Sequence, residues 1–280
     1  MVTDVLLRLS GVEFAYEPAR PVLTDVTVDV ETGRRLAVLG PNGGGKTTLF
    51  RLAVGALTPQ AGHVEVAGKP VRRTRAGLLA LRQRVQLVLQ DPDDQLFSAS
   101  VRQDVSFGPL NLGLSDPQVR QRCDEALTAL GIDALAERPP HLLSYGQRKR
   151  VAIAGAVALR PRLLILDEPT AGLDPAGVEA LLHTLDDLQA TGTTVMMSTH
   201  DVNLAFRWAD TVVVVSGGGA RTMPAAEALA DAALLAGSQL TPAWAPLVHR
   251  LLDRLPGLDG ARPRSATELA ALLDAVGGAG

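Results

Sequence analysis

Gly40-Pro41-Asn42-Gly43-Gly44-Gly45-Lys46-Thr47 matches the pattern G-x-x-x-x-G-K-[ST] of a phosphate-binding loop. Its setting suits that motif, because Arg35–Leu39 predicts a short apolar strand before it and Thr47–Val54 predicts a helix after it. Glycines let the backbone curl so that its N–H groups point at phosphates, and the start of the helix adds a favourable dipole. Lys46 would reach the β- and γ-phosphates, and the Thr47 hydroxyl would bind Mg²⁺. The segment therefore predicts a nucleotide site with Mg²⁺.

The composition is that of an ordinary soluble globular protein. The chain has 280 residues, of which 46% are hydrophobic and 20% charged, and this length allows one large domain with a small appendage. The net charge of -3 provides no sequence-wide basic field that would attract nucleic acid or anionic lipid, so we expect no nucleic-acid partner. No apolar run approaches the roughly 18 residues of a membrane span. Cys123 is the only cysteine, which excludes an internal disulfide and favours a reducing cytosol.

Two strand patterns divide the chain. Residues Leu6–Val30 alternate apolar and polar side chains, which predicts antiparallel strands with one exposed face, and Gly62–Gly68 adds another short strand. Later runs are largely apolar, and Val85–Leu89 in particular is expected to be more buried. The remaining runs of this kind are Leu163–Leu166, Val195–Thr199 and Thr211–Val215. Helical patterns lie between these runs, so we expect an α/β fold with a mostly parallel sheet covered on both faces.

Helical patterns also occupy the middle and the end of the chain. Residues Val101–Gly131 read as helical, with breaks expected at Gly108-Pro109 and at Ser115-Asp116-Pro117, where Ser115 or Asp116 can cap a new helix. The tail after Thr222 is rich in Ala and Leu and contains several prolines. It predicts a few short helices packed as an appendage.

An acidic pair ends one of the buried strands. Leu163–Leu166 is followed directly by Asp167 and Glu168, and ligand sites of α/β sheets gather at the carboxyl ends of strands. Asp167 would hold Mg²⁺, and Glu168 would polarise an attacking water. Taken alone, the pair could equally be a solvated acidic turn. The phosphate-binding loop upstream favours the catalytic interpretation, because Mg-nucleotide chemistry requires such a carboxylate.

A third motif lies at Leu142–Arg150, at the start of an expected helix that leads to the acidic strand. Ser144 and Gly146 at a helix start can bind an anion through the hydroxyl, the free N–H groups and the dipole. The same residues also suit an ordinary serine N-cap, and the motif alone favours that simpler interpretation.

Leu143–Gln147 resembles the LSGGQ signature of ATP-binding cassette (ABC) ATPases. Other motifs of that family occur in its usual order along the chain. Tyr16 matches the aromatic that stacks on adenine, and Gln90 matches the glutamine that senses Mg²⁺ and the attacking water. Ala171–Asp174 matches the loop that crosses the dimer interface, and His200 matches the switch histidine that contacts the γ-phosphate. Each residue alone has a plain structural explanation, whereas their joint order and spacing favour the family. The likeness covers about residues 5–220.

The resemblance implies a set of site residues. The implied ATP-binding residues are Tyr16, Gly40, Pro41, Asn42, Gly43, Gly44, Gly45, Lys46, Thr47, Thr48, Ser144, Gly146, Gln147 and Asp174. Thr47, Gln90 and Asp167 would bind Mg²⁺, and Glu168, His200 and Gln90 would be catalytic. The family also implies a head-to-tail dimer, in which Ser144 and Gly146 of one chain meet the γ-phosphate held by Lys46 of the other. Both the phosphate-binding loop and the signature motif look competent, so a homodimer with two active sites is expected. A heterodimer of two different ATPases is the alternative.

The resemblance also implies the organisation of the chain. We expect an ABC ATP-binding domain over residues 5–225, with an N-terminal antiparallel β subdomain and a helical signature subdomain at about 91–160, and a C-terminal helical appendage over 226–280. Three positions depart from the usual motifs, namely Gly44, Thr47 and Tyr145. Thr47 keeps its hydroxyl and Gly44 its backbone N–H, so nucleotide binding should survive. Tyr145 stands where glycine is usual, and we interpret it as a mark of a subfamily.

The segment Gln90–Gly113 looks like the ATPases of energy-coupling factor (ECF) importers, and most like their cobalt/nickel branch. The resemblance implies two partners, a transmembrane coupling subunit and a substrate-binding membrane subunit, and a peripheral place on the cytoplasmic face of the cell membrane. Asp91, Asp93 and Asp94 could dock arginines of the coupling subunit or form a solvated acidic loop. The alternatives for function are vitamin uptake by an ECF transporter and a soluble ABC ATPase without transport. The compact interval from Lys46 to Ser144 has no sustained heptads, which argues against the soluble class.

Overall fold

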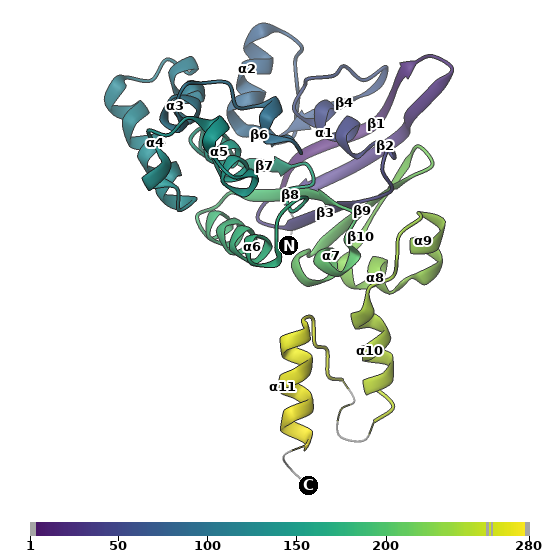
Figure 1. Ribbon diagram of the computed structural model, residues 1–280. Helices are drawn as coiled ribbons and strands as arrows, with labels where there is room; N and C mark the ends of the chain where they lie inside the picture. The colour runs from purple at the N-terminus through teal and green to yellow at the C-terminus, as the bar shows by residue number, and fades with distance from the viewer. Residues whose placement is uncertain (1–3, 256–257, 259, 278–280) are drawn as a thin grey trace.

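A six-stranded sheet forms the centre of the computed structural model, which describes residues 4–255, 258 and 260–277 (Figure 1). Its strand order is β10-β9-β3-β8-β7-β6; β10 pairs antiparallel with β9 and the other neighbours pair parallel. The strands are β3 (Arg35–Leu39), β6 (Val85–Val88), β7 (Leu163–Leu166), β8 (Thr194–Thr199), β9 (Thr211–Ser216) and β10 (Gly219–Pro224). All residues of β7 and β8 are buried, which explains the continuous apolar run of β7 and the apolar centre of β8. The predicted α/β fold with a mostly parallel sheet is confirmed.

A four-stranded antiparallel sheet lies beside the central sheet, in the order β2-β1-β4-β5. Its strands are β1 (Val5–Glu17), β2 (Arg20–Glu31), β4 (Ala61–Val66) and β5 (Lys69–Pro70). The alternating side chains of β1 and β2 place one face in a hydrophobic cluster shared with α1 (Lys46–Ala53) and with β3. Helix α1 is therefore held between the two sheets, and this fixes the phosphate-binding loop that precedes it.

Helices cover the other side of the central sheet and share one large hydrophobic cluster with it. They are α3 (Val101–Asn111), α4 (Asp116–Ala129), α5 (Tyr145–Val157), α6 (Pro175–Ala190) and α7 (Val202–Trp208), whereas α2 (Arg75–Arg84) precedes β6. Short 3-10 turns occur at Pro92–Asp94, Asp133–Leu135 and Pro140–Leu142. Figure 1 shows α3, α4 and α5 gathered at one side of the molecule.

One expectation for an individual element was wrong. Helix α3 continues through Gly108-Pro109 to Asn111 instead of breaking there; its buried residues are Val101, Asp104, Val105 and Pro109 itself, and α3 shares a hydrophobic cluster with α5. Gly108 permits this packing, since an added Cβ would lie 3.0 Å from the Leu159 side chain. Strand β6 lies at the edge of the sheet, yet residues 85–89 are all buried or partly buried, so this run is more buried than β1 and β2, as expected. The expected cap at Ser115 is present, and the Gln118 side chain accepts a hydrogen bond from the Ser115 N–H (3.0 Å).

The described part of the C-terminal tail forms four helices, α8 (Ala225–Ala230), α9 (Ala232–Gly237), α10 (Trp244–Leu252) and α11 (Ala266–Gly277). Leu229 and Leu235 belong to the main hydrophobic cluster, so α8 and α9 pack as part of the core. Helices α10 and α11 project from it (Figure 1). Two contacts tie them to α7: Asn203 accepts from the Trp244 N–H (3.0 Å), and the Arg264 side chain donates to the Phe206 carbonyl (2.6 Å).

Candidate nucleotide site

The loop of residues 40–47 joins β3 to α1 at the carboxyl end of the central sheet. Gly40 lies against β9, where an added Cβ would come within 2.3 Å of the Val215 carbonyl oxygen. Gly45 precedes α1 with a φ of +104°, a backbone conformation that residues with a Cβ rarely adopt. The Gly44 N–H donates to the Pro41 carbonyl (3.0 Å) and closes the turn. The tight path of the loop therefore accounts for its glycines.

Lys46 places a buried positive charge over this loop. Its side chain is 8% exposed, and its ammonium donates to the carbonyl oxygens of Gly40 (2.8 Å) and Pro41 (3.3 Å). The same nitrogen lies 3.4 Å from Glu168 Oε1. A buried ammonium needs such partners, and it attracts any anion that enters the loop.

Asp167 connects three segments beneath the loop. Its Oδ2 accepts a hydrogen bond from the Thr47 hydroxyl (2.6 Å), and its Oδ1 accepts one from the Ser198 hydroxyl (2.6 Å). Strand β8, which carries Ser198, lies between β3 and β7, so these three strand ends meet as neighbours. Hydroxyl and carboxylate oxygens are the ligands that Mg²⁺ prefers, and Thr47 with Asp167 fit that ion. The motifs did not single out Ser198, whose only signal is its place two residues before His200.

Glu168 lies next to Asp167 but is held differently. Its φ is +44°, and its N–H donates to the Ser198 hydroxyl (2.8 Å). The carboxylate is buried; Oε2 pairs with His200 Nδ1 at 3.0 Å, and within the described residues Oε1 accepts no hydrogen bond. An unusual backbone conformation and a buried oxygen without a hydrogen bond are both typical of functional sites. Oε1 faces the Lys46 ammonium at 3.4 Å and can still accept a hydrogen bond from a bound molecule.

These residues surround one cavity of about 440 Å³. Its lining includes the loop from Pro41 to Thr48 together with Tyr16, Gln90, Asp167 and Glu168. The Tyr16 ring is exposed beside the loop, with its hydroxyl 3.3 Å from Thr48 Oγ1 and its edge against Phe14. The structure therefore brings the loop, the aromatic side chain, the glutamine and the two carboxylates together.

The other predicted site residues lie elsewhere. Ser144, Gly146, Gln147 and Asp174 line a separate cavity of about 560 Å³ at the start of α5 and α6. Ser144 caps α5 by accepting from the Gln147 N–H (3.3 Å), and the Gln147 side chain accepts in return from the Ser144 N–H (3.0 Å). Asp174 likewise caps α6 by accepting from the Gly177 N–H (2.7 Å). Within one chain these residues serve as helix caps and do not line the cavity around Lys46.

Lys149 and Tyr145 join the two cavities, and the sequence did not indicate this role for them. The buried Lys149 ammonium donates to the carbonyl oxygens of Glu168, Pro169 and Ala171, each at 2.9 Å. Burial lowers the pKa of Lys149 to about 8, against the opposing influence of the Glu168 charge. The Tyr145 hydroxyl donates to the Gln90 carbonyl (3.4 Å). The start of α5 is therefore fastened to the segments that carry Gln90 and Glu168.

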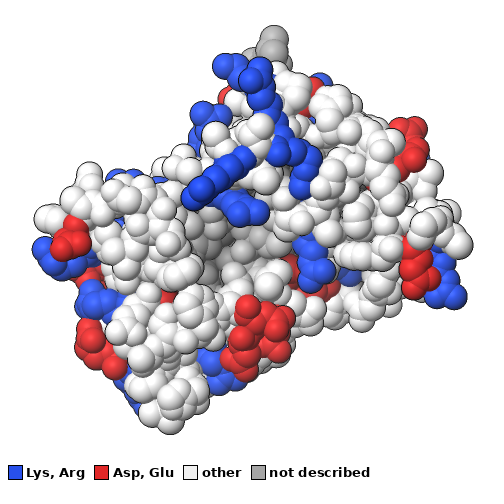
Figure 2. Space-filling view, turned by 90° about the horizontal axis from the view of Figure 1, so that it is seen from above, with Lys and Arg blue, Asp and Glu red and all other residues white. Residues whose placement is uncertain are grey.

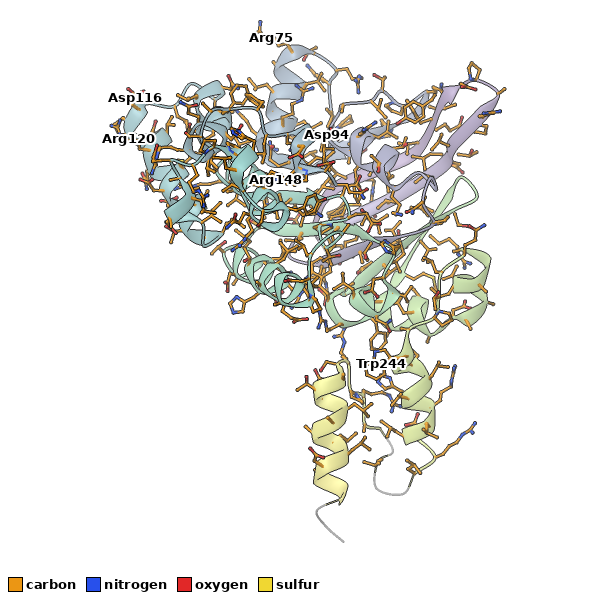
Figure 3. The ribbon with its side chains drawn as sticks, viewed as in Figure 1. Arg75, Asp94, Asp116, Arg120, Arg148 and Trp244 are labelled. Carbon is orange, nitrogen blue, oxygen red and sulfur yellow. The ribbon has the colours of Figure 1, made fainter. Side chains whose placement is uncertain are left out.

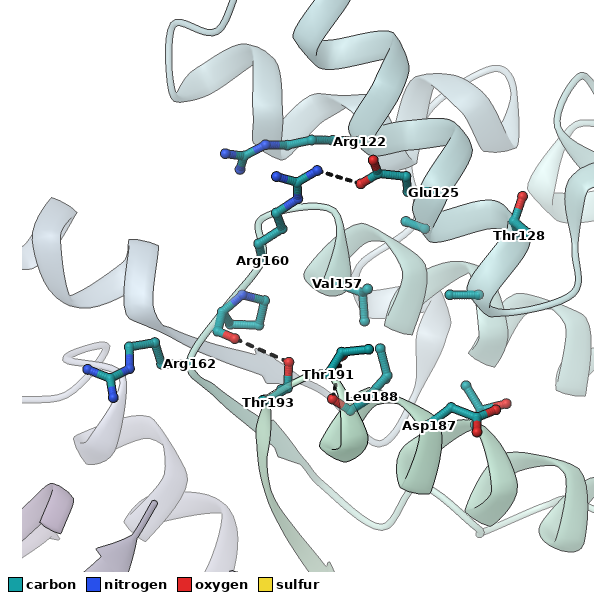
Figure 4. Close-up of a pocket in the computed structure, with 15 residues that line it drawn as sticks. Arg122, Glu125, Thr128, Val157, Arg160, Arg162, Asp187, Leu188, Thr191 and Thr193 are labelled. Carbon is teal, nitrogen blue, oxygen red and sulfur yellow. Dashed lines mark hydrogen bonds and ion pairs between the residues drawn. The ribbon is translucent and has the colours of Figure 1, made fainter. Parts of the chain in front are cut away.

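A larger cavity of about 660 Å³ opens between α4, α5 and α6 (Figure 4). Arg162 and Thr193 in its lining directly precede β7 and β8, so it lies at the amino ends of these strands. Arg160 in this cavity pairs with Glu125 at 2.6 Å. The phosphate-binding loop occupies the opposite edge of the sheet, and the larger cavity is therefore distinct from the nucleotide site.

Comparison with known families gives one decisive match. Residues 23–171, which include the phosphate-binding loop, the capped helix α5 and the acidic pair, match the ABC transporter family. The chain belongs to this family. The predicted resemblance to ABC ATPases is confirmed, and ATP binding and hydrolysis follow from membership.

Relatives narrow the type of ABC ATPase. The chain is 49% identical to the cobalt import ATP-binding protein CbiO of Rhodobacter capsulatus, over 95% of this chain and 96% of that protein. It is 40% identical to the energy-coupling factor transporter ATP-binding protein EcfA2 of Methanospirillum hungatei, over 97% of this chain and 69% of that protein. The chain is an ABC ATPase of the energy-coupling factor type.

Solved structures agree with this assignment. CbiO1 from Clostridium perfringens, described as part of the ABC transporter complex CbiONQ, aligns with a TM-score of 0.77 and 38% identity, over 91% of this chain and 98% of that one. The ATP-binding cassette MJ0796, solved as a dimer in a post-hydrolysis state with ADP and Pi, aligns with a TM-score of 0.71 and 26% identity, over 79% of this chain and 99% of that one. In the part of this ABC chain that the structure describes, no helix is both long and apolar enough to cross a membrane.

Proposed function

We propose that this ABC ATPase energises the uptake of cobalt or nickel ions through a membrane partner. The observation that carries the proposal is the cluster beneath the phosphate-binding loop, where Thr47, Asp167, Glu168 and His200 lie within hydrogen-bonding reach of one another or of Lys46. This cluster supports the hydrolysis, and the name of the R. capsulatus relative supports the choice of metal ion. The chain would act from the cytoplasmic face of the membrane as a peripheral subunit.

The residues of the cavity divide the work of binding. Lys46 and the N–H groups of residues 45–48 at the start of α1 would bind the phosphates of ATP, and the exposed Tyr16 ring would stack on adenine. Thr47, Asp167 and Gln90 supply oxygen atoms that would bind Mg²⁺, which neutralises the developing charge on the phosphates when it is bound. Ser198 would position Asp167 through its hydrogen bond to Oδ1.

Glu168 and His200 would perform the proton transfer. Glu168 Oε1 accepts no hydrogen bond among the described residues and can take a proton from an attacking water. His200 holds the other carboxylate oxygen at 3.0 Å and so fixes the direction of Oε1. Because His200 itself is exposed, its ring can also contact the γ-phosphate.

A second chain would complete the site. Ser144, Gly146, Gln147 and Asp174 line a cavity of their own, and in a head-to-tail dimer they would face the nucleotide held by Lys46 of the other copy. We favour two copies of this chain, because it contains both halves; the dimer of the MJ0796 cassette supports such an arrangement. A pair of two different ATPases is the alternative.

The membrane partner would dock beside Gln90. Phe97 and Phe107 form an exposed edge-to-face pair at 4.9 Å, next to the acidic turn at Pro92–Asp94. Asp93 is engaged within the chain by Arg148 (2.8 Å), whereas Asp94 is exposed without an ion pair among the described residues (Figure 3). We therefore assign the docking role to Asp94 and Phe97 rather than to Asp93.

Co-purification tests the docking. Asp94→Lys combined with Phe97→Ser should release the ATPase from its transmembrane partner while leaving the ATPase activity of the isolated chain intact. Asp93→Asn is the matched control, because it removes only the internal pair with Arg148. Retention of the partner by the double variant would refute this docking site.

Uptake measurements test the substrate. Cells that express the membrane subunits should accumulate labelled cobalt or nickel only with this chain, and Glu168→Gln should abolish accumulation because hydrolysis drives it. Uptake of a vitamin in place of a metal ion would identify the alternative ECF function. No transport of either, with ATPase activity intact, would favour an ABC ATPase that is not coupled to transport.

A further inference from the structure

Residues 69–84 form a basic stretch that the proposed function does not use. It contains six cationic side chains, and the sequence has no Asp or Glu between Glu65 and Asp91, although the whole chain has a net charge of -3. The six, which we call the α2 basic patch, are Lys69, Arg72, Arg73, Arg75, Arg82 and Arg84. All are exposed, and none forms an ion pair within the described residues. Such a concentration of unpaired charge repels itself unless an anionic surface covers it.

The patch is rigidly built. The Thr74 hydroxyl accepts from the Gly77 N–H (3.1 Å) and caps α2, while the Arg73 side chain donates to the Leu57 carbonyl (3.0 Å). An added Cβ at Gly77 would lie 2.1 Å from the Arg72 carbonyl oxygen, so the preceding loop is pressed against the first turn of the helix. The arginines of the loop and of α2 are therefore held side by side before any partner arrives.

The outward face of α2 combines this charge with apolar surface. Leu81 is buried, whereas Leu79 is 49% exposed and Ala76 and Ala80 are also exposed. Arg75 and Arg82 lie one heptad apart on this exposed side. Cations that flank a small apolar strip, without any acidic residue, are typical of helices that lie on a membrane surface.

The position of α2 agrees with such a role. Figure 1 places α2 at the top of the molecule, and Figure 3 shows Arg75 at its outer end. Figure 2 looks down on that side and shows a broad band of Lys and Arg side chains, with a compact group of Asp and Glu on the same face. The acidic turn at Pro92–Asp94, where we dock the membrane partner, follows β6 and therefore lies only one short strand beyond α2.

We propose that the α2 basic patch binds the anionic phospholipid headgroups that surround the transmembrane partner. The proposal rests on the proposed function only in placing the chain at the membrane. Guanidinium groups donate paired hydrogen bonds to phosphate oxygens, and each basic side chain near an anionic bilayer strengthens binding by roughly fivefold. Contact with lipid would hold the ATPase flat against the membrane and orient its docking site toward the partner.

Vesicle co-flotation of the purified full chain tests this directly. The chain should float with vesicles of phosphatidylcholine and phosphatidylglycerol in equal parts, and not with phosphatidylcholine alone. Binding should fall as salt rises from about 0.1 M to about 1 M, because the Debye length shrinks from about 10 Å to about 3 Å. Arg72→Gln, Arg75→Gln and Arg82→Gln together should weaken binding on the order of 100-fold. Their side chains make no hydrogen bond within the described residues, and glutamine keeps a good helix propensity.

A matched control variant separates the effect of the position of the arginines from the effect of the lost charge. Arg20→Gln, Arg120→Gln and Arg221→Gln remove the same charge from exposed positions on β2, α4 and β10, and this variant should float almost like the parent. Unchanged ATPase activity in both variants would show that each is folded. The proposal is overturned if the parent shows no preference for anionic vesicles, or if the α2 variant floats like the parent. An α2 variant that floats normally but loses its membrane partner would assign the patch to protein contact instead. Because the vesicles contain no protein, failure here leaves the proposed function standing.

Discussion

Around Lys46 the polar groups converge on a cavity, whereas around Ser144 they satisfy one another. The first region contains a buried ammonium, two buried carboxylates and a carboxylate oxygen without a hydrogen bond among the described residues. The second contains a closed capping box, in which Ser144 and Gln147 exchange hydrogen bonds. A region with a strained backbone and a buried polar atom without a hydrogen bond is typical of a site that binds a ligand. A helix start whose polar groups are all hydrogen-bonded resembles ordinary structure.

The difference shows how a site can be divided between two chains. The region around Lys46 must hold charges out of water, so its purpose is visible in a single chain. The region around Ser144 has the N–H groups of a helix start and no local substrate, so we expect it to become functional opposite a second chain. The predictions below separate these two regions, beginning with the largest effect.

Mixing two inactive variants provides the strongest test. Lys46→Ala removes the phosphate-binding charge, and Ser144→Arg blocks the start of α5, so each variant alone should hydrolyse ATP only at background. In a mixed dimer, one site pairs an intact loop with an intact capped helix, and activity should return. Measured phosphate release from the mixture, compared with each variant alone, gives the answer. Absence of any recovery would contradict pairing of two copies through complementary halves.

Replacing Glu168 probes the first region alone. Glu168→Gln keeps the shape of the side chain but cannot accept a proton, so turnover should fall by about 10²-fold or more while ATP affinity is preserved. Phosphate release and binding of a fluorescent ATP analogue would measure both quantities. Glu179→Gln is the control, since Glu179 is an exposed glutamate paired with Arg207 on the surface. Near-normal turnover in Glu168→Gln would rule out Glu168 as the base.

The two regions also differ in how far the sequence predicted them. The phosphate-binding loop, the acidic pair and the strands around them follow from local rules, because glycine spacing and apolar runs have direct backbone consequences. Ser198 escaped attention because its contact with Asp167 joins residues 31 positions apart. Lys149 escaped for the same reason, since its partners are backbone carbonyls, which no side-chain pattern records. The division into two cavities required the three-dimensional structure.

Local rules failed where packing prevailed. Gly108-Pro109 usually ends a helix, yet α3 continues because its contacts with α5 and Leu159 outweigh the lost backbone hydrogen bond. A tertiary contact, which no local rule records, decided this outcome.

Lys149 joins the two regions, and its removal should have a moderate effect. Lys149→Met deletes three hydrogen bonds to buried carbonyl oxygens, which should lower the free energy of unfolding by about 2 kcal/mol near neutral pH. The folded pKa of about 8 lies below the ordinary value of about 10.4, so above pH 8 the unfolded chain binds a proton that the folded chain has lost. The stability of the parent relative to Lys149→Met should therefore rise from about pH 8 to about pH 10. Urea unfolding of both proteins across this pH range would measure the difference in their free energies of unfolding. A difference that falls as the pH rises would contradict the lowered pKa of Lys149.

Tyr145→Phe should have the smallest effect of these variants. It separates the contribution of the Tyr145 hydroxyl from that of the ring in joining the two regions. The hydroxyl donates to the Gln90 carbonyl at 3.4 Å, a long hydrogen bond, so its loss should cost less than about 1 kcal/mol of stability. The ring should matter more, because it packs on Gly172 and lies 5.5 Å from the Lys149 ammonium. Tyr145→Ala should therefore destabilise more than Tyr145→Phe, and a double-mutant cycle with Lys149→Met should show coupling only for the alanine variant. Equal coupling for both variants would place the link in the hydroxyl and not in the ring.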